Sequence, residues 1–400
     1  MATSRTVVVA GAGIGGLTAA LALAQRGLRV ALLDQADKLE ETGAGIQLSP
    51  NATRVLTALG LEQRLKADAV SPLAVEVKTA RGRGIARVPL GGVALGRYGA
   101  PYWTIHRADL QAALLEAVRG SPDIELKLGT RVEDFIVHEH GVTVACRRGA
   151  ATADEQGIAL IGADGLWSGL RTRLGNEATP QYRHRTAWRA LIPAEAVAPE
   201  FGEPHVHLWL GPDAHLVHYP VKAGALVNVV AIVGDRWTGS GWSEPGARDD
   251  LLRHFPRWRW SEQARTLIGA AESWHKWALA DLKPLRRWGD GPVTLIGDAA
   301  HPMLPFLAQG AGMAIEDAAV LASSMAHTPD DVAGGMRRYE KARRKRTAKV
   351  QRAARKNGNT FHLAGAEALV RNLVLRTLGG KMLLGRYDWL YNWRPVPPKS

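Results

Sequence analysis

The chain has 400 residues, of which 46% are hydrophobic and 22% are charged, a balance typical of soluble globular proteins. Its length allows two domains or one domain with a large insertion, and no apolar run reaches the roughly 18–20 residues of a membrane span. The single cysteine, Cys146, excludes an internal disulfide and a cysteine metal cluster. Because the first residues lead directly into a strand pattern without signal-peptide features, we expect a reduced, cytoplasmic protein with no membrane contact and no metal site.

Basic residues outnumber acidic ones by 51 to 38, and much of the excess lies in one helical pattern, residues 337–357. One interpretation is a nucleic-acid-binding surface. The other is a solvated helix face within a positive field that attracts anionic small molecules. A charged run on a helix is usually a solvated face, so we expect an acidic cofactor or substrate and no nucleic-acid partner.

The first elements predict a βαβ unit within about 30 residues. The run TVVVA is typical of a buried strand, and IGGLTAALALAQRG has helical spacing and ends at Gly27. The next run, LRVALLD, is typical of a parallel strand.

Three glycines between the first strand and the helix, Gly11, Gly13 and Gly16, form the pattern G-x-G-x-x-G. Gly11 permits a tight turn, Gly13 lets a pyrophosphate approach the backbone, and Gly16 allows close helix packing. Asp34 ends the second strand at about the distance expected for an acid that binds a ribose hydroxyl. The acid suits an adenosine ribose without a 2′-phosphate, so we expect FAD or NAD.

The middle of the chain predicts short segments of both kinds. A helix start at residues 49–51 is followed by short strands and glycine turns over residues 71–102. HRADLQAALLEAV predicts a helix, hairpin-like strands follow it, and GIALIGADGLWSGLRTRLG repeats the strand–loop–helix form. Residues 179–274 predict alternating β segments, and the chain beyond GPVTLIGDAAHP is mostly helical.

A second strand that ends in an acid, LIGD at residues 295–298, is followed by another glycine-rich loop and a helix. Asp298 is positioned to accept hydrogen bonds from ribityl hydroxyls. The loop with Gly310, Ala311 and Gly312 can direct N–H groups and a helix N-terminus toward a flavin, where the helix dipole stabilises the anionic reduced ring. FAD is longer than one βαβ unit, so we predict that the two loops hold its opposite ends.

The predicted fold is α/β, with a Rossmann-like FAD-binding domain, an inserted β-rich substrate domain and a helical C-terminus. The FAD-binding domain is discontinuous and comprises residues 1–72, 103–178 and 275–345. The substrate domain comprises residues 73–102 and 179–274, and residues 346–400 form the C-terminal helical segment. The aromatic residues of GRYDWLYNWRPVPP allow either a clamp or a dimer contact, and both a monomer and a homodimer remain open.

Three motifs, GAGIGG, GADGLWSGLR and GDAAHPMLPFLAQGAGMAIEDA, resemble the flavin-binding motifs of single-component FAD-dependent aromatic hydroxylases. This family includes salicylate, 3-hydroxybenzoate and 6-hydroxynicotinate hydroxylases and is related to p-hydroxybenzoate hydroxylase. GAGIQLSPNA, HRADL and YEKARRKR also match, so the resemblance covers essentially the whole chain. It implies that NADH or NADPH reduces FAD, that O2 forms a C4a-hydroperoxide, and that one oxygen enters an aromatic ring. No second G-x-G-x-x-G occurs, in keeping with a nicotinamide nucleotide that binds only transiently.

The resemblance implies cofactor contacts at further positions. Asp164 and Gly165 resemble a DG motif of the family, Arg107 resembles its arginine at the ribityl–phosphate region, and Gln111 lies one helical turn away. Relatives commonly carry glutamate where this chain has Asp34, and either carboxylate can bind a ribose. The predicted cofactor-binding residues are Gly11, Gly13, Ile14, Gly15, Gly16, Asp34, Gly45, Ile46, Arg107, Gln111, Asp164, Gly165, Asp298, Pro302, Gly310, Ala311, Gly312 and Met313.

The resemblance also implies a substrate pocket on the β-rich insert. His215 and Tyr219, the predicted catalytic residues, resemble a His-x-x-x-Tyr pair, and along a strand their offset of four places both on one face. A histidine near its usual pKa would take a phenolic proton, directly or through the tyrosine, and activate the ring; the alternative is a structural histidine. The predicted substrate-binding residues are Gln47, Pro305 and Phe306. Relatives that use 3-hydroxybenzoate tend to carry a polar side chain where this chain has Pro305, which disfavours that substrate.

Two rival functions are weighed against a hydroxylase. A FAD-dependent reductase, desaturase or cyclase of the same fold would need a long apolar tunnel for its substrate. A non-catalytic flavin- or nucleic-acid-binding protein would show no substrate-stimulated oxidation of NAD(P)H. The polar residues expected in the pocket favour a hydroxylase acting on a small anionic aromatic, such as a hydroxybenzoate or a hydroxypyridine carboxylate.

Overall fold

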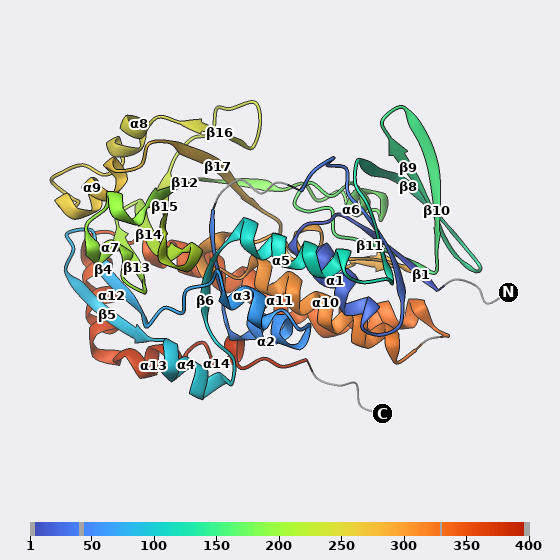
Figure 1. Cartoon of the computed structure of the whole chain (residues 1–400). Helices are drawn as coiled ribbons and strands as arrows, with labels where there is room; N and C mark the ends of the chain where they lie inside the picture. The colour runs from blue at the N-terminus through green and yellow to red at the C-terminus, as the bar shows by residue number, and fades with distance from the viewer. Residues whose placement is uncertain (1–4, 40–43, 329, 396–400) are drawn as a thin grey trace.

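The computed structural model describes residues 5–39, 44–328 and 330–395. Two large sheets lie toward opposite ends of the molecule, and the long helix α11 (Val332–Phe361) extends between them (Figure 1). At one end α11 contacts the first sheet, and at the other Arg355 binds Asp281 of the second sheet at 2.6 Å.

The first sheet has six strands in the order β18-β19-β11-β1-β2-β7, parallel except for the β18–β19 pair. Its strands are β1 (Thr6–Ala10), β2 (Arg29–Leu33), β7 (Ile124–Lys127), β11 (Ala159–Gly162), β18 (Gly289–Asp290) and β19 (Val293–Leu295). The predicted βαβ unit is present, with α1 (Ile14–Ala24) between the parallel strands β1 and β2. Helix α1 packs against α5 (Arg107–Arg119) and α10 (Gly310–Ala326), so the sheet is covered and its central strands β11 and β1 are largely apolar.

The second sheet has eight strands in the order β16-β17-β12-β15-β14-β13-β4-β5. They are β4 (Ala74–Thr79), β5 (Gly84–Pro89), β12 (Gln181–Pro193), β13 (His205–Gly211), β14 (Ala214–Val221), β15 (Leu226–Gly234), β16 (Ser243–Gly246) and β17 (Trp274–Asp281). Neighbours are antiparallel except β13 and β4, which pair in parallel. Two distant parts of the sequence therefore share one sheet.

The remaining elements cover the ends and faces of these sheets. The smaller sheets consist of β8 (Thr130–His138), β9 (Gly141–Arg148) and β10 (Ala151–Gly157), and of β3 (Gly45–Leu48) and β6 (Trp103–His106). The remaining helices are α2 (Pro50–Ala58), α3 (Glu62–Lys66), α4 (Gly91–Tyr98), α6 (Gly169–Arg173), α7 (Pro199–Gly202), α8 (Arg248–Arg253), α9 (Glu262–Gly269), α12 (Gly365–Leu378), α13 (Gly380–Gly385) and α14 (Asp388–Tyr391). Four 3-10 turns are η1 (Ala194–Ala196), η2 (Lys222–Gly224), η3 (Gly297–Ala299) and η4 (Pro305–Leu307).

Several short helices lie where the sequence pattern predicted only strands and turns, namely α4, α7, α8 and α9. Helix α9 illustrates the reason. The side chain of Ser261 accepts a hydrogen bond from the N–H of Ala264 and caps the helix, and the buried Leu267 and Ile268 pack against the second sheet's core. A single short amphipathic turn gives too weak a periodicity to be separated from strands on either side.

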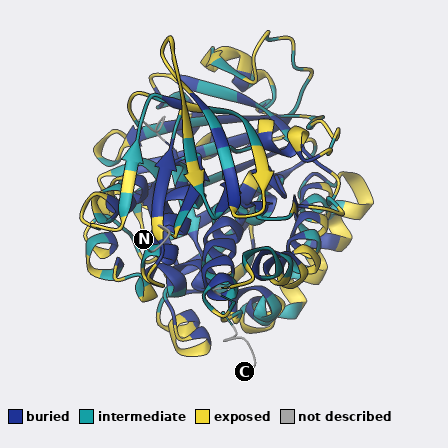
Figure 2. Cartoon of the chain, turned by 90° about the vertical axis from the view of Figure 1, so that its right-hand side faces the viewer, coloured by how far each residue is buried: buried dark blue, intermediate teal, exposed yellow. Residues whose placement is uncertain are grey.

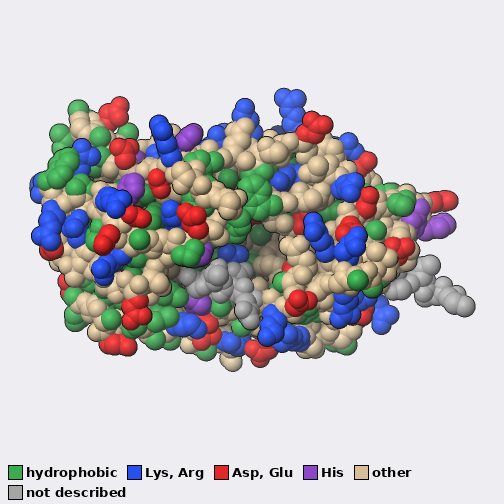
Figure 3. Space-filling view, turned by 90° about the horizontal axis from the view of Figure 1, so that it is seen from above, with side chains coloured by type: hydrophobic (Ala, Val, Ile, Leu, Met, Phe, Trp, Pro, Cys, Tyr) green, Lys and Arg blue, Asp and Glu red, His purple; other side chains and the backbone are tan. Residues whose placement is uncertain are grey.

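Each sheet has its own apolar core, and the buried strands and helices lie inside a rim of exposed loops and helix faces (Figure 2). The C-terminal aromatic segment packs on its own chain, with the Tyr391 ring edge-on to Tyr98 and Tyr102. Among the described residues, no helix is both long and apolar enough to cross a membrane. Acidic and basic side chains are interspersed over the face seen in Figure 3.

Candidate active site

A cavity of about 340 Å³ lies where the glycine-rich loops meet one face of the second sheet. Gly13, Ile14 and Gly15 line one side of it, and side chains of β12, β14 and β15 line another. The loop before α10 forms a third side. Segments almost three hundred positions apart in the sequence therefore line one cavity.

The glycines of the first loop divide into those that pack and one that faces open space. Gly11 has a φ of +109°, and a Cβ there would lie 2.4 Å from a carbonyl oxygen just after β11. A Cβ on Gly16 would lie 1.7 Å from the carbonyl oxygen of Gly11, whereas one on Gly13 would meet nothing within 4 Å. The carboxylate of Asp34 accepts the N–H of Ala12, which lies in the loop, at 2.6 Å. Its other oxygen accepts the N–H of Ala36 at 2.9 Å.

Two helix N-termini open onto the cavity. Helix α1 begins at Ile14 and α10 begins at Gly310, and both residues line the cavity. Neither helix has a capping side chain or an acidic residue in its first turn. The N–H groups left without intrahelical partners, together with the helix dipoles, suit a bound anion.

Asp298 lies deep in the protein, yet its side chain is exposed because it points into the cavity. Burial by the surrounding protein raises the pKa of this carboxyl group. A carboxylate with protein behind it and open space in front fits the hydroxyl-bearing chain of a flavin cofactor. The residues therefore fit FAD. Gly13 and α1 at the pyrophosphate, Asp298 at the ribityl chain and the start of α10 at the flavin stay predictions.

A buried ionic cluster holds the second loop in place. Arg343 of α11 binds Asp317 at 2.7 Å and Glu316 at 2.5 Å, and each of the three side chains is at most 1% exposed. Asp317 also contacts Nε2 of His301 at 2.5 Å and accepts the N–H of Gly297 at 3.0 Å, directly before the cavity carboxylate. Burial alone would raise the pKa of Asp317, but His301 and Arg343 outweigh it, so this pKa lies below its usual value.

The second sheet presents a row of side chains to the cavity. The strand register places Arg189 of β12 beside Val230 of β15, and Val230 beside Val217 of β14. His215 and Tyr219 lie on either side of Val217 along β14, and all five side chains line the cavity. The face thus combines two polar groups and a guanidinium with apolar valines.

The expectation that His215 has a pKa near its usual value is wrong. The side chain is 2% exposed, and burial lowers its pKa well below the usual value, with His362 and Arg185 adding to the effect. Burial raises the pKa of the Tyr219 hydroxyl, which Arg189 and Gln47 only partly offset. At neutral pH the histidine is therefore neutral and the tyrosine is protonated.

The predicted substrate-binding residues take different places. Gln47 lines the cavity and accepts a hydrogen bond from the hydroxyl of Tyr102 at 2.7 Å, and Pro305 also lines it. Phe306 is not among the lining residues. Its ring is 6% exposed and packs 5.5 Å from the ring of His215, in an apolar cluster behind the cavity wall.

The predicted cofactor-binding residues also fall into two groups, and their roles stay predictions. Those that line the cavity are Gly13, Ile14, Gly15, Gly45, Ile46, Arg107, Gly165, Asp298, Gly310 and Ala311. Those that do not line it are Gly11, Gly16, Asp34, Gln111, Asp164, Pro302, Gly312 and Met313. Gln111 and Met313 are buried, the Pro302 carbonyl accepts from Gln351 at 2.9 Å, and the Asp164 carboxylate accepts the N–H of Leu170.

Arg189 is the functional candidate that sequence reasoning missed. Its guanidinium carbon lies 5.0 Å from the centre of the Trp277 ring, and the residue lines the cavity. A basic residue within the strand pattern TAWRALIP is the only signal in the sequence. That signal does not show on which face of the sheet the side chain lies, because this depends on how the neighbouring strands pair.

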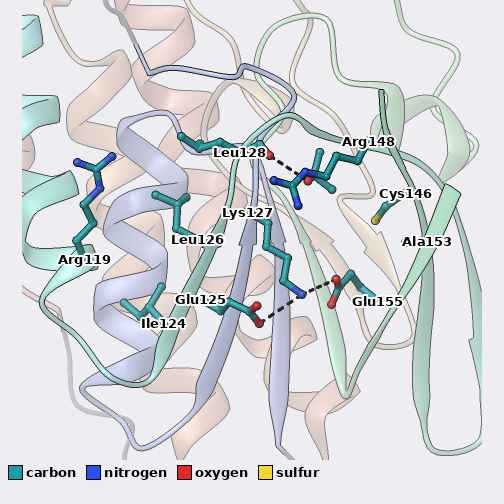
Figure 4. A pocket seen from close by; sticks show the side chains of 11 residues that line it. Arg119, Ile124, Glu125, Leu126, Lys127, Leu128, Cys146, Arg148, Ala153 and Glu155 are labelled. Carbon is teal, nitrogen blue, oxygen red and sulfur yellow. Dashed lines mark hydrogen bonds and ion pairs between the residues drawn. The ribbon is translucent and has the colours of Figure 1, made fainter. Parts of the chain in front are cut away.

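A larger, open groove of about 860 Å³ lies between the edge strand β7 and the three-stranded sheet (Figure 4). Its central cation, Lys127, is paired with Glu155 at 2.6 Å and Glu125 at 3.3 Å. Burial raises the pKa of the Cys146 thiol to about 11, so this thiol is unreactive at neutral pH. The groove lacks the convergent groups of the cavity and is not assigned as the active site.

Comparison with known proteins agrees with the geometry. The chain matches the FAD binding domain family over residues 4–354. It is 36% identical to 3-hydroxybenzoate 6-hydroxylase of Polaromonas naphthalenivorans, with 97% of this chain and 96% of the relative covered. It is 38% identical to 3-amino-4-hydroxybenzoate 2-monooxygenase PtnB3 of Streptomyces platensis, with 98% and 97% covered.

The structure is also similar to that of Klebsiella pneumoniae HpxO complexed with FAD and uric acid. The TM-score is 0.84 at 27% sequence identity, and 96% of each chain is covered. The resemblance to FAD-dependent aromatic hydroxylases, first drawn from short motifs, is thereby confirmed over the whole chain. This chain belongs to the FAD-binding family of aromatic ring monooxygenases.

Proposed function

We propose that the substrate is a small aromatic carboxylate that carries a ring hydroxyl. The observation that carries this proposal is the position of Arg189, which lines the same cavity as His215 and Tyr219. A guanidinium recognises a carboxylate by charge-assisted hydrogen bonds. The relatives named above are a 3-hydroxybenzoate hydroxylase and a 3-amino-4-hydroxybenzoate monooxygenase, and both names describe a hydroxybenzoate.

The chemistry that FAD supplies when bound, with NADH or NADPH as electron donor, is activation of O2 for transfer of one oxygen atom to the ring. The chain's own residues orient the ring and keep water away from it. Arg189 fixes the carboxylate end, and Val217 and Val230 offer an apolar wall for the ring. His215 and Tyr219 lie within the cavity wall to bind the hydroxyl that activates the ring.

The rival reductase, desaturase or cyclase is less well supported. It requires a long apolar tunnel, whereas this cavity of about 340 Å³ is lined by Gln47, Arg189, His215 and Tyr219. A nucleic-acid-binding role for α11 is also disfavoured. Several arginines of its basic run, Arg343, Arg346 and Arg355, form ion pairs with carboxylates of the same chain. We expect no nucleic-acid partner, and a monomer and a homodimer remain equally open.

The test is oxidation of NADH and of NADPH by the FAD-loaded protein, with and without a panel of ring-hydroxylated benzoates and pyridine carboxylates. The proposal predicts that one acid stimulates oxidation and yields a product with one added oxygen. The matched control is the same panel without the carboxyl group, which is expected to stimulate much less. Stimulation by the decarboxylated phenols alone would contradict the proposal.

A further inference from the structure

A line of three polar side chains leads from the cavity toward the outside of the second sheet. Nδ1 of His215 lies 2.7 Å from Nε2 of His362, which directly follows α11. Nδ1 of His362 in turn contacts the guanidinium Nη1 of Arg185 on β12. The histidines are 2% and 7% exposed and Arg185 is half-buried. Only His215 lines the cavity.

Arginine fixes the direction of each hydrogen bond in this line. A guanidinium has only donors and no acceptor, so Nδ1 of His362 must be the nitrogen without a proton. The proton of neutral His362 is then on Nε2, which donates to Nδ1 of His215. Because Nδ1 of His215 accepts this bond, the proton of His215 is on Nε2, the nitrogen left for the cavity.

The surroundings keep both rings neutral. The charged groups closest to His362 are Arg185 and Arg371, and Arg371 donates to the last carbonyls of α11 at 2.9 and 3.0 Å. His215 is packed by the rings of Phe306 and Phe361. Burial, reinforced by these arginines, lowers the pKa of His362 to about 3. The negative charge of Asp213 acts on Arg185 and opposes the effect of burial on its pKa.

We propose that Arg185 and His362 are positioning residues that hold His215 in the tautomer with Nε2–H toward the substrate. In this tautomer His215 has no lone pair available to the substrate hydroxyl. It therefore donates a hydrogen bond to an ionised oxygen and does not remove the phenolic proton. The substrate hydroxyl binds as the phenolate, or loses its proton to another acceptor. The tautomer of His215 is inferred from the structure alone, and only the identity of the ligand rests on the proposed function.

The tautomer is tested directly on the FAD-loaded enzyme by 15N labelling of its histidines. The 15N chemical shift distinguishes a protonated ring nitrogen from a bare one, and His215→Gln and His362→Gln identify the two rings. The expected result at neutral pH is that both rings carry the proton on Nε2 and none on Nδ1. A proton on Nδ1 of His215, or a doubly protonated ring, would overturn the proposal. This readout needs no substrate, so it stands even if the proposed substrate class is wrong.

The consequence for ligand binding is tested by calorimetry with two probes, 4-hydroxy-3-nitrobenzoate and 3-nitrobenzoate, which differ only in the ring hydroxyl. Loss of one charge-assisted hydrogen bond corresponds to roughly ten- to hundredfold in affinity. His362→Leu and Arg185→Leu are expected to weaken binding of the hydroxylated probe by that factor and to leave the other probe's binding unchanged.

Conservative variants separate positioning from a merely structural role. Arg185→Lys keeps a donor and His362→Gln offers both a donor and an acceptor, so both are expected to restore binding of the hydroxylated probe. His207→Gln, a buried histidine on the neighbouring strand β13 that does not line the cavity, is the matched control and is expected to change neither probe. The proposal would be overturned if the leucine variants lost affinity for both probes equally and the conservative variants did not restore it. If neither probe binds the unmodified enzyme, the substrate class is contradicted and the 15N shifts decide the tautomer.

Discussion

Among single residues, Arg189 most directly distinguishes a carboxylated substrate from a neutral one. Strand register places Arg189 beside Val230, and its guanidinium lies against the Trp277 ring, so its position does not depend on a flexible loop. We expect Arg189→Met to raise KM for a hydroxybenzoate roughly ten- to hundredfold, the cost of one charge-assisted hydrogen bond. The effect on kcat is expected to be smaller, because the carboxylate is bound equally in the ground and transition states.

Steady-state kinetics with matched substrates check this prediction. The same variant with a phenol that lacks the carboxylate is the control and should show an unchanged KM. Arg189→Lys is expected to lie between the two, because an ammonium keeps the charge and loses the bidentate geometry. If KM rises equally for the acid and for the phenol, Arg189 does not bind the carboxylate.

The residue scale is also where sequence reasoning was least complete. Gly13 and Asp298 follow from local patterns, since a strand, a turn and a helix N-terminus lie within a few positions of each. Arg189 and His362 do not, because each meets His215 or its neighbours only through contacts with distant segments. The pKa of His215 depends on burial by those same segments. No local pattern carries that information.

At the scale of elements, the turns before and after α1 offer a matched pair of glycines. Gly11 and Gly27 both have a positive φ, +109° and +76°, but only at Gly11 would a Cβ meet the backbone, at 2.4 Å. Gly27→Ala is expected to cost about 1–2 kcal/mol in the free energy of unfolding, the penalty of a left-handed conformation. Gly11→Ala is expected to cost more and to distort the loop that carries Gly13.

The readout is the FAD content of the purified variants, measured by flavin absorbance, together with urea unfolding. We expect FAD to be lost from Gly11→Ala and retained by Gly27→Ala. Full FAD content in the first variant would mean that the loop tolerates a shift of its neighbouring strand.

The start of α10 depends on the buried ionic cluster behind it. Arg343 is 1% exposed and binds both Asp317 and Glu316, so its removal deprives two buried carboxylates of a fully buried cationic partner. We expect Arg343→Met to lower the free energy of unfolding by about 3–5 kcal/mol. Lys345→Met, two positions along the same helix and exposed, is the control and is expected to change it by less than about 0.5 kcal/mol. Urea denaturation at neutral pH measures both, and a small loss in the first variant would mean that water replaces the guanidinium.

Elements differ in how far the sequence specifies them. The βαβ unit and α10 were predicted because long apolar runs, glycines and an acid occur in one order. Helices α8 and α9 were not, because six and eight residues give little periodicity among neighbouring strands. The parallel pairing of β13 with β4 joins segments more than a hundred residues apart, and nothing in either strand identifies its partner.

For the whole molecule, the buried histidines determine how stability changes with pH. Burial lowers the pKa of His207 and His362 to about 3, and lowers those of His215 and His218 well below the usual value. The unfolded chain, with histidine pKa values of about 6.5, therefore takes up protons that the folded chain does not. Stability is complete above about pH 6.5 and falls as the pH drops toward 3.

Each such histidine is expected to cost about 1.4 kcal/mol between pH 7.5 and 5.5, because its unfolded form becomes protonated over that interval. The carboxyl group of Asp317, whose pKa is lowered, also reduces the free energy of unfolding as it becomes protonated at lower pH.

Urea unfolding at the two pH values measures the total loss of stability. His207→Gln removes one of the sites and should reduce the acid-induced loss by about 1.4 kcal/mol. His140→Gln, at an exposed position, should leave the loss unchanged. If both variants lose as much stability as the unmodified protein, the folded state takes up the proton at His207, and burial is weaker there than the packing indicates.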